Sequence, residues 1–309
     1  MTAFAALFRD RLLAETLSET LADAVPDPAT DATVAPALAK ARQADGVEGK
    51  VLAFCRALPR AARGQAAVTG ALTLVRWGLL AAVGVAAVAG GAAAARAMAT
   101  GSRDIVNIVW LLGALLGLHG LAFLAWLALL IGARQAPARH GLGSAAIGAW
   151  RWLTGRLGGD ALARAARQAV LARLTAPPAG RWVVSVLSHA LWTAFLLGGT
   201  VVVMALLSTQ HVVFVWETTI LSDHHFRALI DALAAAPSAI GFPVPDERAI
   251  AMAQWRGVPL PGQQETSWAG FLIGSLLIYG LVPRLLALMV SMGLARRALR
   301  RLPVDLTAP

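Results

Sequence analysis

The stretch that decides the fold runs from Ile105 to Ala133 and reads IVNIVWLLGALLGLHGLAFLAWLALLIGA. It contains no Asp, Glu, Lys or Arg. About 20 apolar residues in a helix cross the hydrocarbon core of a bilayer, and the backbone must close its hydrogen bonds internally there. The stretch therefore predicts a transmembrane helix that is long enough to tilt or to extend beyond the lipid.

The whole composition is that of a membrane protein. Of 309 residues, 58% are hydrophobic and 14% are charged, whereas an average soluble domain has about 25% charged residues. We predict an all-α membrane protein with four transmembrane helices: a first hairpin in 77–133, a third span in 182–207 and a fourth in 268–292. Spans one, three and four open with a tryptophan, as interfacial anchors do: Trp77, Trp182 and Trp268.

Basic residues are distributed unevenly among the segments that join these spans. There are 27 Lys and Arg against 17 Asp and Glu. If the segments alternate sides, 21 basic residues fall on one side and five on the other, with Arg284 inside the last span. Cytoplasmic loops carry an excess of Lys and Arg, so both termini are expected in the cytoplasm. The N-terminus lacks a secretory signal pattern, so we expect an internal span to direct insertion.

The segments outside the lipid follow from this orientation. Residues 1–76 are predicted as a helical cytoplasmic region, and 293–309 as a basic cytoplasmic tail. Residues 208–267 form a compact external segment between spans three and four. The basic loop 134–181 contains an amphipathic helix, Asp160–Leu174, which either lies on anionic lipid headgroups or docks an acidic partner.

Local signals place breaks and caps in these segments. Asp45 and the glycine after it indicate a break in the helix expected at Pro36–Leu58. The β-branched run Val212–Leu221 is either a strand or a continuation of the third span. Ser222 or its neighbour is expected to cap a helix that runs to Ala235, and Asp246 a helix that runs to Trp255.

Common catalytic signatures are absent. The sequence has no G-x-x-x-x-G-K-[ST], H-E-x-x-H, G-x-S-x-G or G-x-G-x-x-G motif, and its one cysteine, Cys55, cannot form an internal disulfide. We therefore expect no catalytic residue and no cofactor. Nucleic acid is not expected as a partner, because positive cytoplasmic loops explain the charge and aromatic residues rarely interleave with it.

Polar residues within the spans are the main functional candidates, because such residues are costly in lipid. Ser185, His189 and Thr193 share one face of the third span, and His119 lies near the middle of the second. The two histidines could relay a proton or respond to pH. Because no Asp or Glu lies within any span, we favour neutral imidazoles that hydrogen-bond neighbouring helices.

Arg284 lies inside the fourth span, roughly 24 Å along a helix from Trp268. This position predicts an arginine that snorkels to the inner surface; the alternative is a buried gate or anion ligand. The preceding Pro283 removes a hydrogen bond to the carbonyl of Tyr279 and predicts a kink.

Two weaker patterns suggest partners. Gly113 and Gly117 form a G-x-x-x-G motif, which favours close helix packing within the chain or a homodimer. The external segment also contains side chains of the type that bind metals, although their spacing matches no defined site: His211, Glu217, Asp223, His224 and His225. Capping and surface exposure are the favoured interpretation of this group, so no metal is expected.

Several stretches together resemble the bacterial domain-of-unknown-function 2868 family, over most of residues 70–301. They are FVWETTILS (Phe214–Ser222), IGFPVPD (Ile240–Asp246), VNIVWLLGALLGLHGL (Val106–Leu121), SHALWTAFLLGG (Ser188–Gly199) and IYGLVPRLLAL (Ile278–Leu288). The resemblance implies a multi-pass inner-membrane protein, and a soluble GTPase encoded beside it as a partner. It assigns no catalytic residue, but it marks as motif positions Trp216, Glu217 and Asp246 alongside His119 and His189.

Three functions remain open on this evidence. The first is a membrane scaffold or anchor, with the lipid bilayer around its spans, that recruits a soluble cytoplasmic partner such as a GTPase. The second is an oligomeric transporter or channel that uses the intramembrane His, Ser and Thr side chains and Arg284. The third is a metal-binding sensor in the external segment.

Overall fold

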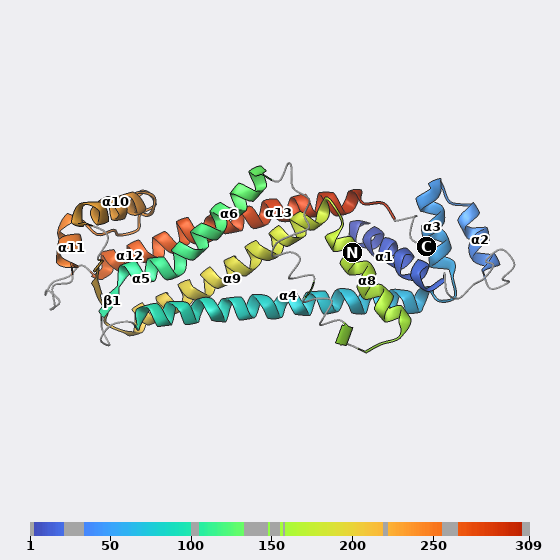
Figure 1. Cartoon of the computed structure of the whole chain (residues 1–309), viewed down its shortest axis with the longest axis horizontal. Helices are drawn as coiled ribbons and strands as arrows, with labels where there is room; N and C mark the ends of the chain where they lie inside the picture. Colours follow the sequence, from blue (N-terminus) through green and yellow to red (C-terminus); the bar gives the residue numbers. More distant parts are fainter. Residues whose placement is uncertain are drawn as a thin grey trace. The chain divides into compact units, whose positions relative to one another are not determined.

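The computed structural model describes residues 3–21, 34–99, 105–132, 148, 155–156, 158–218, 222–254 and 265–304. Most of these residues are helical, and in this part of the chain the one sheet has two strands (Figure 1). The chain divides into two compact units. Unit 1 comprises residues 1–79, 137–186 and 290–309, and unit 2 comprises residues 80–136 and 187–289.

The elements follow one another in a simple order. They are α1 (Ala3–Leu21), α2 (Ala35–Arg42), α3 (Gly46–Ala57), α4 (Ala61–Met98), β1 (Ile105–Asn107), α5 (Ile108–Leu112), the π-helix η1 (Gly113–Gly117), α6 (Leu118–Gly132), α8 (Ala161–Thr175), α9 (Ala179–Thr209), β2 (Val213–Val215), α10 (Asp223–Ala239), α11 (Glu247–Met252), α12 (Glu265–Ser275), the π-helix η2 (Leu276–Leu281) and α13 (Val282–Arg301).

The structure has four candidate membrane-spanning helices, the number predicted. Four helices are long and apolar enough to cross a membrane: Ala61–Met98, Ile108–Leu130, Ala179–Thr209 and Glu265–Arg301. The second span begins at Ile108 rather than at Ile105, because the residues before it form β1. Asn107 then caps the helix, and its side-chain oxygen accepts a hydrogen bond from the backbone N–H of Val109 at 2.9 Å.

The surface of these helices suits lipid rather than water. Large apolar side chains point outward along them; Val88 is 73% exposed, Leu129 70% and Leu121 68%. Soluble monomers rarely expose continuous apolar surface of this kind. The exposed apolar helices therefore indicate a bilayer around the spans.

Two glycines, one on each helix, bring α4 and α9 into backbone contact within unit 2. A Cβ atom on Gly90 would lie 1.8 Å from the carbonyl oxygen of Phe195, and one on Gly198 would lie 2.0 Å from that of Ala87. In contrast, a Cβ on Gly113 or Gly117 would meet no described atom within 4 Å. The predicted motif therefore makes no close contact within the described chain, and the homodimer through it stays a prediction.

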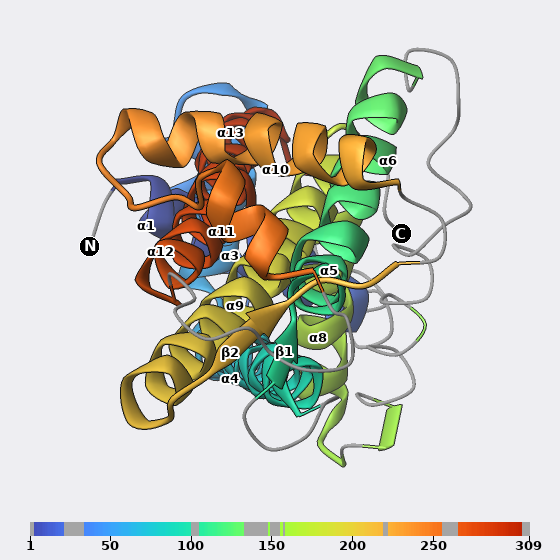
Figure 2. The same ribbon diagram turned by 90° about the vertical axis from the view of Figure 1, so that its left-hand side faces the viewer.

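The loops beyond α4 and α9 form a small folded region in unit 2. Strands β1 and β2 pair in parallel, with Ile105 opposite Val213 (Figure 2). The strand alternative is thus correct for part of the β-branched run. Ser222 caps α10, as predicted, although α10 extends to Ala239 instead of Ala235, and it packs on α12. The longer helix brings more of its apolar face onto the core.

Asp246 also caps a helix as predicted. Its carboxylate oxygen accepts a hydrogen bond from the backbone N–H of Ala249 at 2.7 Å, and α11 ends at Met252, before the predicted end. The core of this region includes Trp268, which is fully buried. Its prediction as an interfacial anchor is therefore wrong, because the segment between α9 and α12 covers the first turns of α12.

Unit 1 contains α1, α2, α3 and α8, the first parts of α4 and α9 and the end of α13. The predicted break is present: α2 ends at Arg42 and α3 begins at Gly46, whose φ of +69° favours glycine. The described N-terminal region is helical, as expected.

Helix α8 begins where predicted and packs on α1. Asp160 caps it, and its carboxylate accepts a hydrogen bond from the N–H of Ala163 at 2.8 Å. The buried face of α8 includes Arg173, which forms an ion pair with Glu15 and donates to the carbonyl of Leu302 at 2.7 Å. One face of this basic helix is therefore occupied by protein.

Candidate functional site in the membrane-spanning helices

The candidate site begins with two distortions of the backbone in unit 2. The π-helix η1 directly precedes the turn that carries His119, and η2 directly precedes the turn that carries Arg284. Short π-helical segments inside α-helices are frequent at functional sites. Both distortions lie where polar side chains of neighbouring spans meet.

Pro283 explains the first contact between these spans. Because proline has no N–H, the carbonyl of Tyr279 loses its usual partner four residues later. That carbonyl lies 3.2 Å from Nε2 of His119. A histidine of one span thus satisfies the group that proline leaves open in another.

Arg284 makes three hydrogen bonds with the two intramembrane histidines. Its Nε donates to Nδ1 of His119 at 2.9 Å, and its Nη2 donates to the backbone carbonyl of His119 at 2.8 Å. Its Nη1 lies 3.1 Å from Nδ1 of His189. Because arginine can only donate, both Nδ1 atoms act as acceptors, so each imidazole is neutral and carries its proton on Nε2.

Aromatic rings surround the guanidinium. Its central carbon lies 5.1 Å from the ring centre of Phe123 and 5.2 Å from that of Trp192. The ring of Trp126 meets the imidazole of His189 edge to face, with centroids 4.5 Å apart. Ring faces attract cations, so these contacts add to the hydrogen bonds that hold Arg284.

The charge of Arg284 has an unusual environment. Its side chain is fully buried, and among the described residues no Asp or Glu forms an ion pair with it. Buried charges are usually paired, because the cost of leaving water is large. Here neutral imidazoles, a carbonyl and ring faces hold the cation instead. The prediction that Arg284 snorkels to the surface is therefore wrong, since His119 and His189 hold it inside.

The predicted polar face of α9 divides among separate contacts. The hydroxyl of Ser185 lies 2.9 Å from that of Ser291. Thr193 is different, since its hydroxyl oxygen is buried and has no hydrogen-bond partner among the described residues. His189 bonds Arg284 through Nδ1, while its Nε2 is likewise buried and has no partner in the described chain. Of the three predicted side chains, His189 is the one that hydrogen-bonds Arg284.

The motif residues between α9 and α12 have mostly structural contacts. Trp216 is buried, donates from Nε1 to the carbonyl of Ile250 at 2.9 Å and stacks on Phe226 with centroids 4.1 Å apart. Asp246 caps α11, as described above. Glu217 is exposed, and its backbone carbonyl lies 3.5 Å from Nδ2 of Asn107. Trp216 and Asp246 thus shape the segment, whereas the Glu217 side chain remains on its surface.

The histidines between α9 and α12 do not gather into a cluster. Among the described residues, no three His, Cys, Asp or Glu side chains come together in a way that could hold a metal ion. His211 lies 3.2 Å from the carboxylate of Glu265, and Nδ1 of His225 lies 2.7 Å from the hydroxyl of Ser222. The described part of the segment therefore provides no ligand set for a metal.

Sequence reasoning identified Arg284, His119 and His189 separately but did not join them. One signal could have done so, because Pro283 frees the carbonyl of Tyr279 and a buried carbonyl needs a donor. An intramembrane histidine without any carboxylate in the spans is a suitable donor. The order of the spans in the bundle, which the sequence does not reveal, decides which histidine it is.

Together, the four apolar spans and this buried polar cluster define a multi-pass helical membrane protein. Residues 157–309 match the family described as Protein of unknown function (DUF2868), so the resemblance seen in the sequence motifs is confirmed. The chain is 35% identical over 189 residues to an uncharacterized membrane protein of Neisseria meningitidis serogroup B; the alignment covers 60% of this chain and 39% of that relative. No solved structure matches the chain.

Proposed function

We propose that the protein is a scaffold in the bacterial cytoplasmic membrane that recruits a soluble partner. Both termini lie in the cytoplasm in this proposal, and residues 208–267 lie outside. The family resemblance implies a GTPase as the partner. The observation that carries the proposal is that unit 1 is a folded helical module with hydrophobic cores of its own.

Buried arginines fasten the two ends of the chain into this module. Arg11 forms an ion pair with Glu48 at 2.6 Å and donates to the carbonyl of Arg300 at 2.9 Å. Arg173 joins Glu15 to the carbonyl of Leu302. Arg11 thus links a carboxylate to the last turn of α13, and Arg173 links one to the residue that follows α13, so the module has a defined surface to present.

The module carries many exposed basic residues. They lie on α2, α3 and α8, between α3 and α4, and at the start of α4: Arg42, Lys50, Arg56, Arg60, Arg63 and Arg164, of which Arg56 forms an ion pair with Asp10. Complementary charge steers association and rejects wrong partners. The surface therefore favours a partner that presents an acidic face.

Cysteine labelling tests the orientation. In a Cys55→Ala background, Arg248→Cys and Arg63→Cys each place one thiol on an exposed position of the external segment or of unit 1. A membrane-impermeant maleimide added to intact spheroplasts should label Arg248→Cys at once, and Arg63→Cys after permeabilisation. The opposite pattern would exclude cytoplasmic termini.

A binding experiment tests recruitment. The full chain in detergent should capture the soluble GTPase encoded beside it, and Arg60→Glu with Arg63→Glu should weaken capture about tenfold or more, because charge reversal opposes an acidic face. Arg248→Glu, on the external segment, is the matched control and should bind like wild type. Wild type that captures no GTPase, or reversed variants that capture it equally, would refute the proposal.

A second candidate, an oligomeric transporter or channel, is favoured by one observation. The guanidinium of Arg284 is buried without a described carboxylate partner and lies beside two π-helical segments, so an anion would find a positive charge there. Liposomes that contain the chain should then pass chloride or phosphate, and Arg284→Gln should abolish the flux. Liposomes without flux would remove this candidate. We do not propose the metal sensor, since no described ligand set favours it.

A further inference from the structure

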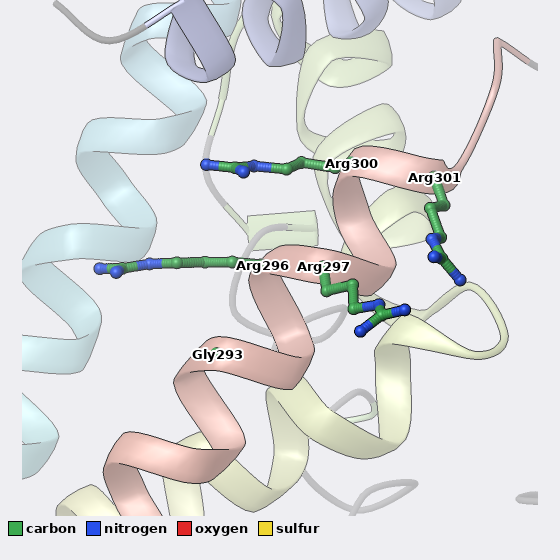
Figure 3. Close-up of a pocket in the computed structure, with 5 residues that line it drawn as sticks. All are labelled: Gly293, Arg296, Arg297, Arg300 and Arg301. Atoms are coloured by element: carbon green, nitrogen blue, oxygen red, sulfur yellow. The ribbon is translucent and has the colours of Figure 1, made fainter.

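Four arginines gather on the last two turns of α13. Together with Gly293 they line an open hollow of about 410 Å³ in unit 1. The arginines are Arg296, Arg297, Arg300 and Arg301, and all four are exposed. In Figure 3, Arg296 and Arg300 extend to one side from successive turns, while Arg297 and Arg301 turn to the other.

Little in the described chain neutralises this group. None of the four forms an ion pair with a described carboxylate. The guanidinium of Arg300 stacks on Phe4, with its carbon 5.0 Å from the ring centre, and its backbone carbonyl is already bonded to Arg11. The positive charges therefore keep most of their hydrogen-bonding capacity for an external anion.

Gly293 shapes the space next to these charges. A Cβ atom placed on it would meet no described atom within 4 Å, so the face of the helix is open one turn before Arg296 and Arg297. A guanidinium group can donate two parallel hydrogen bonds to two oxygens of one phosphate. A volume of about 410 Å³ is within the range of small-ligand pockets, so a phosphate ester with a small polar headgroup fits the hollow.

The preceding turns of the same helix indicate where the phosphate comes from. By helical spacing, the face that carries Gly293 and the arginines is continued toward the span by Leu286, Met289 and Val290. These side chains are 54%, 59% and 57% exposed, as lipid-facing residues are. A molecule with apolar chains and an anionic head would therefore meet apolar side chains first and guanidinium groups next.

We infer that the Arg296–Arg301 hollow binds the phosphate of an anionic phospholipid in the cytoplasmic leaflet. Anionic lipids give that leaflet its negative surface, which attracts arginines beside a span. The bound lipid would neutralise the charges at the end of α13 and hold the span at a defined depth. The inference uses the orientation proposed above, but it does not depend on recruitment of a soluble partner.

Lipid titration of the delipidated full chain in detergent tests this site. Phosphatidylglycerol should bind, as followed by native mass spectrometry, and phosphatidylcholine should not. Arg297→Gln with Arg301→Gln should weaken binding roughly 30-fold, about 2 kcal/mol at about 1 kcal/mol per arginine. Gly293→Leu, which fills the hollow without changing charge, should also weaken binding. Arg164→Gln with Arg248→Gln removes two exposed arginines elsewhere and should leave binding unchanged.

Four outcomes would overturn the inference. Equal binding of the two lipids would show that charge is not recognised, and equal weakening by both double variants would show that the hollow is not the site. Inorganic phosphate that displaces the lipid at equal concentration would assign the site to a free anion. Loss of GTPase capture in the hollow variants, with lipid binding intact, would assign it to a protein.

Discussion

Replacing Arg284 by Met is expected to destabilise the bundle of spans by about 2 to 5 kcal/mol. Three hydrogen bonds disappear, and such bonds average about 0.6 kcal/mol within membranes, which sets the lower value. The change also leaves the Nδ1 atoms of His119 and His189 buried without the hydrogen-bond donor that Arg284 supplies. Each acceptor left without a donor costs about 1–3 kcal/mol. Part of this cost is offset, because the guanidinium charge no longer has to be buried.

Unfolding in detergent by added dodecyl sulfate, followed by tryptophan fluorescence, measures the loss. Arg284→Lys keeps the charge but not the planar fork that reaches several acceptors at once, so it should recover less than half of the stability. The triple variant Arg284→Met, His119→Leu and His189→Leu should recover most of it, because no buried polar partner is left. Leu285 follows Arg284 in the sequence and is 42% exposed. The variant Leu285→Met is therefore the matched control and should behave like wild type.

Two results would refute this reasoning. If Arg284→Met unfolds within about 0.5 kcal/mol of wild type, a typical effect of a neutral surface change, the cluster does not hold the spans together. If Arg284→Lys is as stable as wild type, charge alone is sufficient and the geometry of the guanidinium is irrelevant. Either result would leave the contacts seen here without an energetic role.

Three further predictions concern other parts of the fold. Gly90→Ala should cost about 1–3 kcal/mol in the same unfolding assay because its Cβ would meet the backbone of the facing helix, whereas Gly84→Ala, with open space, should be neutral or slightly stabilising. Burial raises the pKa of Cys55 above its usual value, to about 11; the unfolded thiol ionises first, so stability should fall as pH rises from about 9 toward 11, and the pH dependence of Cys55→Ala should lack that fall. Arg173→Gln should lower the stability of unit 1 by about 3–5 kcal/mol, since it removes the ion pair of the buried Arg173 with Glu15 and the hydrogen bond to the carbonyl of Leu302, and Arg173→Leu with Glu15→Leu should restore most of it; hydrogen exchange in unit 1 that is equal in all three proteins would contradict this.

The features that local chemistry controls were predicted well. Apolar length alone locates a span, because lipid forces the backbone to satisfy its own hydrogen bonds. Ser222, Asp160 and Asp246 cap helices as expected, since a short polar side chain satisfies free N–H groups at a helix start. The break before Gly46 is likewise local, because it depends on the positive φ that this glycine adopts.

Other features depend on neighbours that the sequence does not reveal. Trp268 begins its span as an anchor would, but the segment between α9 and α12 covers it. The G-x-x-x-G motif at Gly113 is open within the described chain, while Gly90 and Gly198 make the close helix contact. A glycine shows that close approach is allowed, but the position of the other helix decides whether it occurs.

The amino-acid sequence was therefore sufficient for the membrane class, the number of spans and the positions of caps and breaks, because each depends on residues near one another in the chain. The contacts of Arg284 are an example of a feature that only the folded chain reveals. Its neighbours in sequence are apolar, whereas the groups that hold it come from residues 119 and 189 on other helices. Only the packing of the spans brings these donors and acceptors within hydrogen-bond distance, since their separation along the chain carries no information about it.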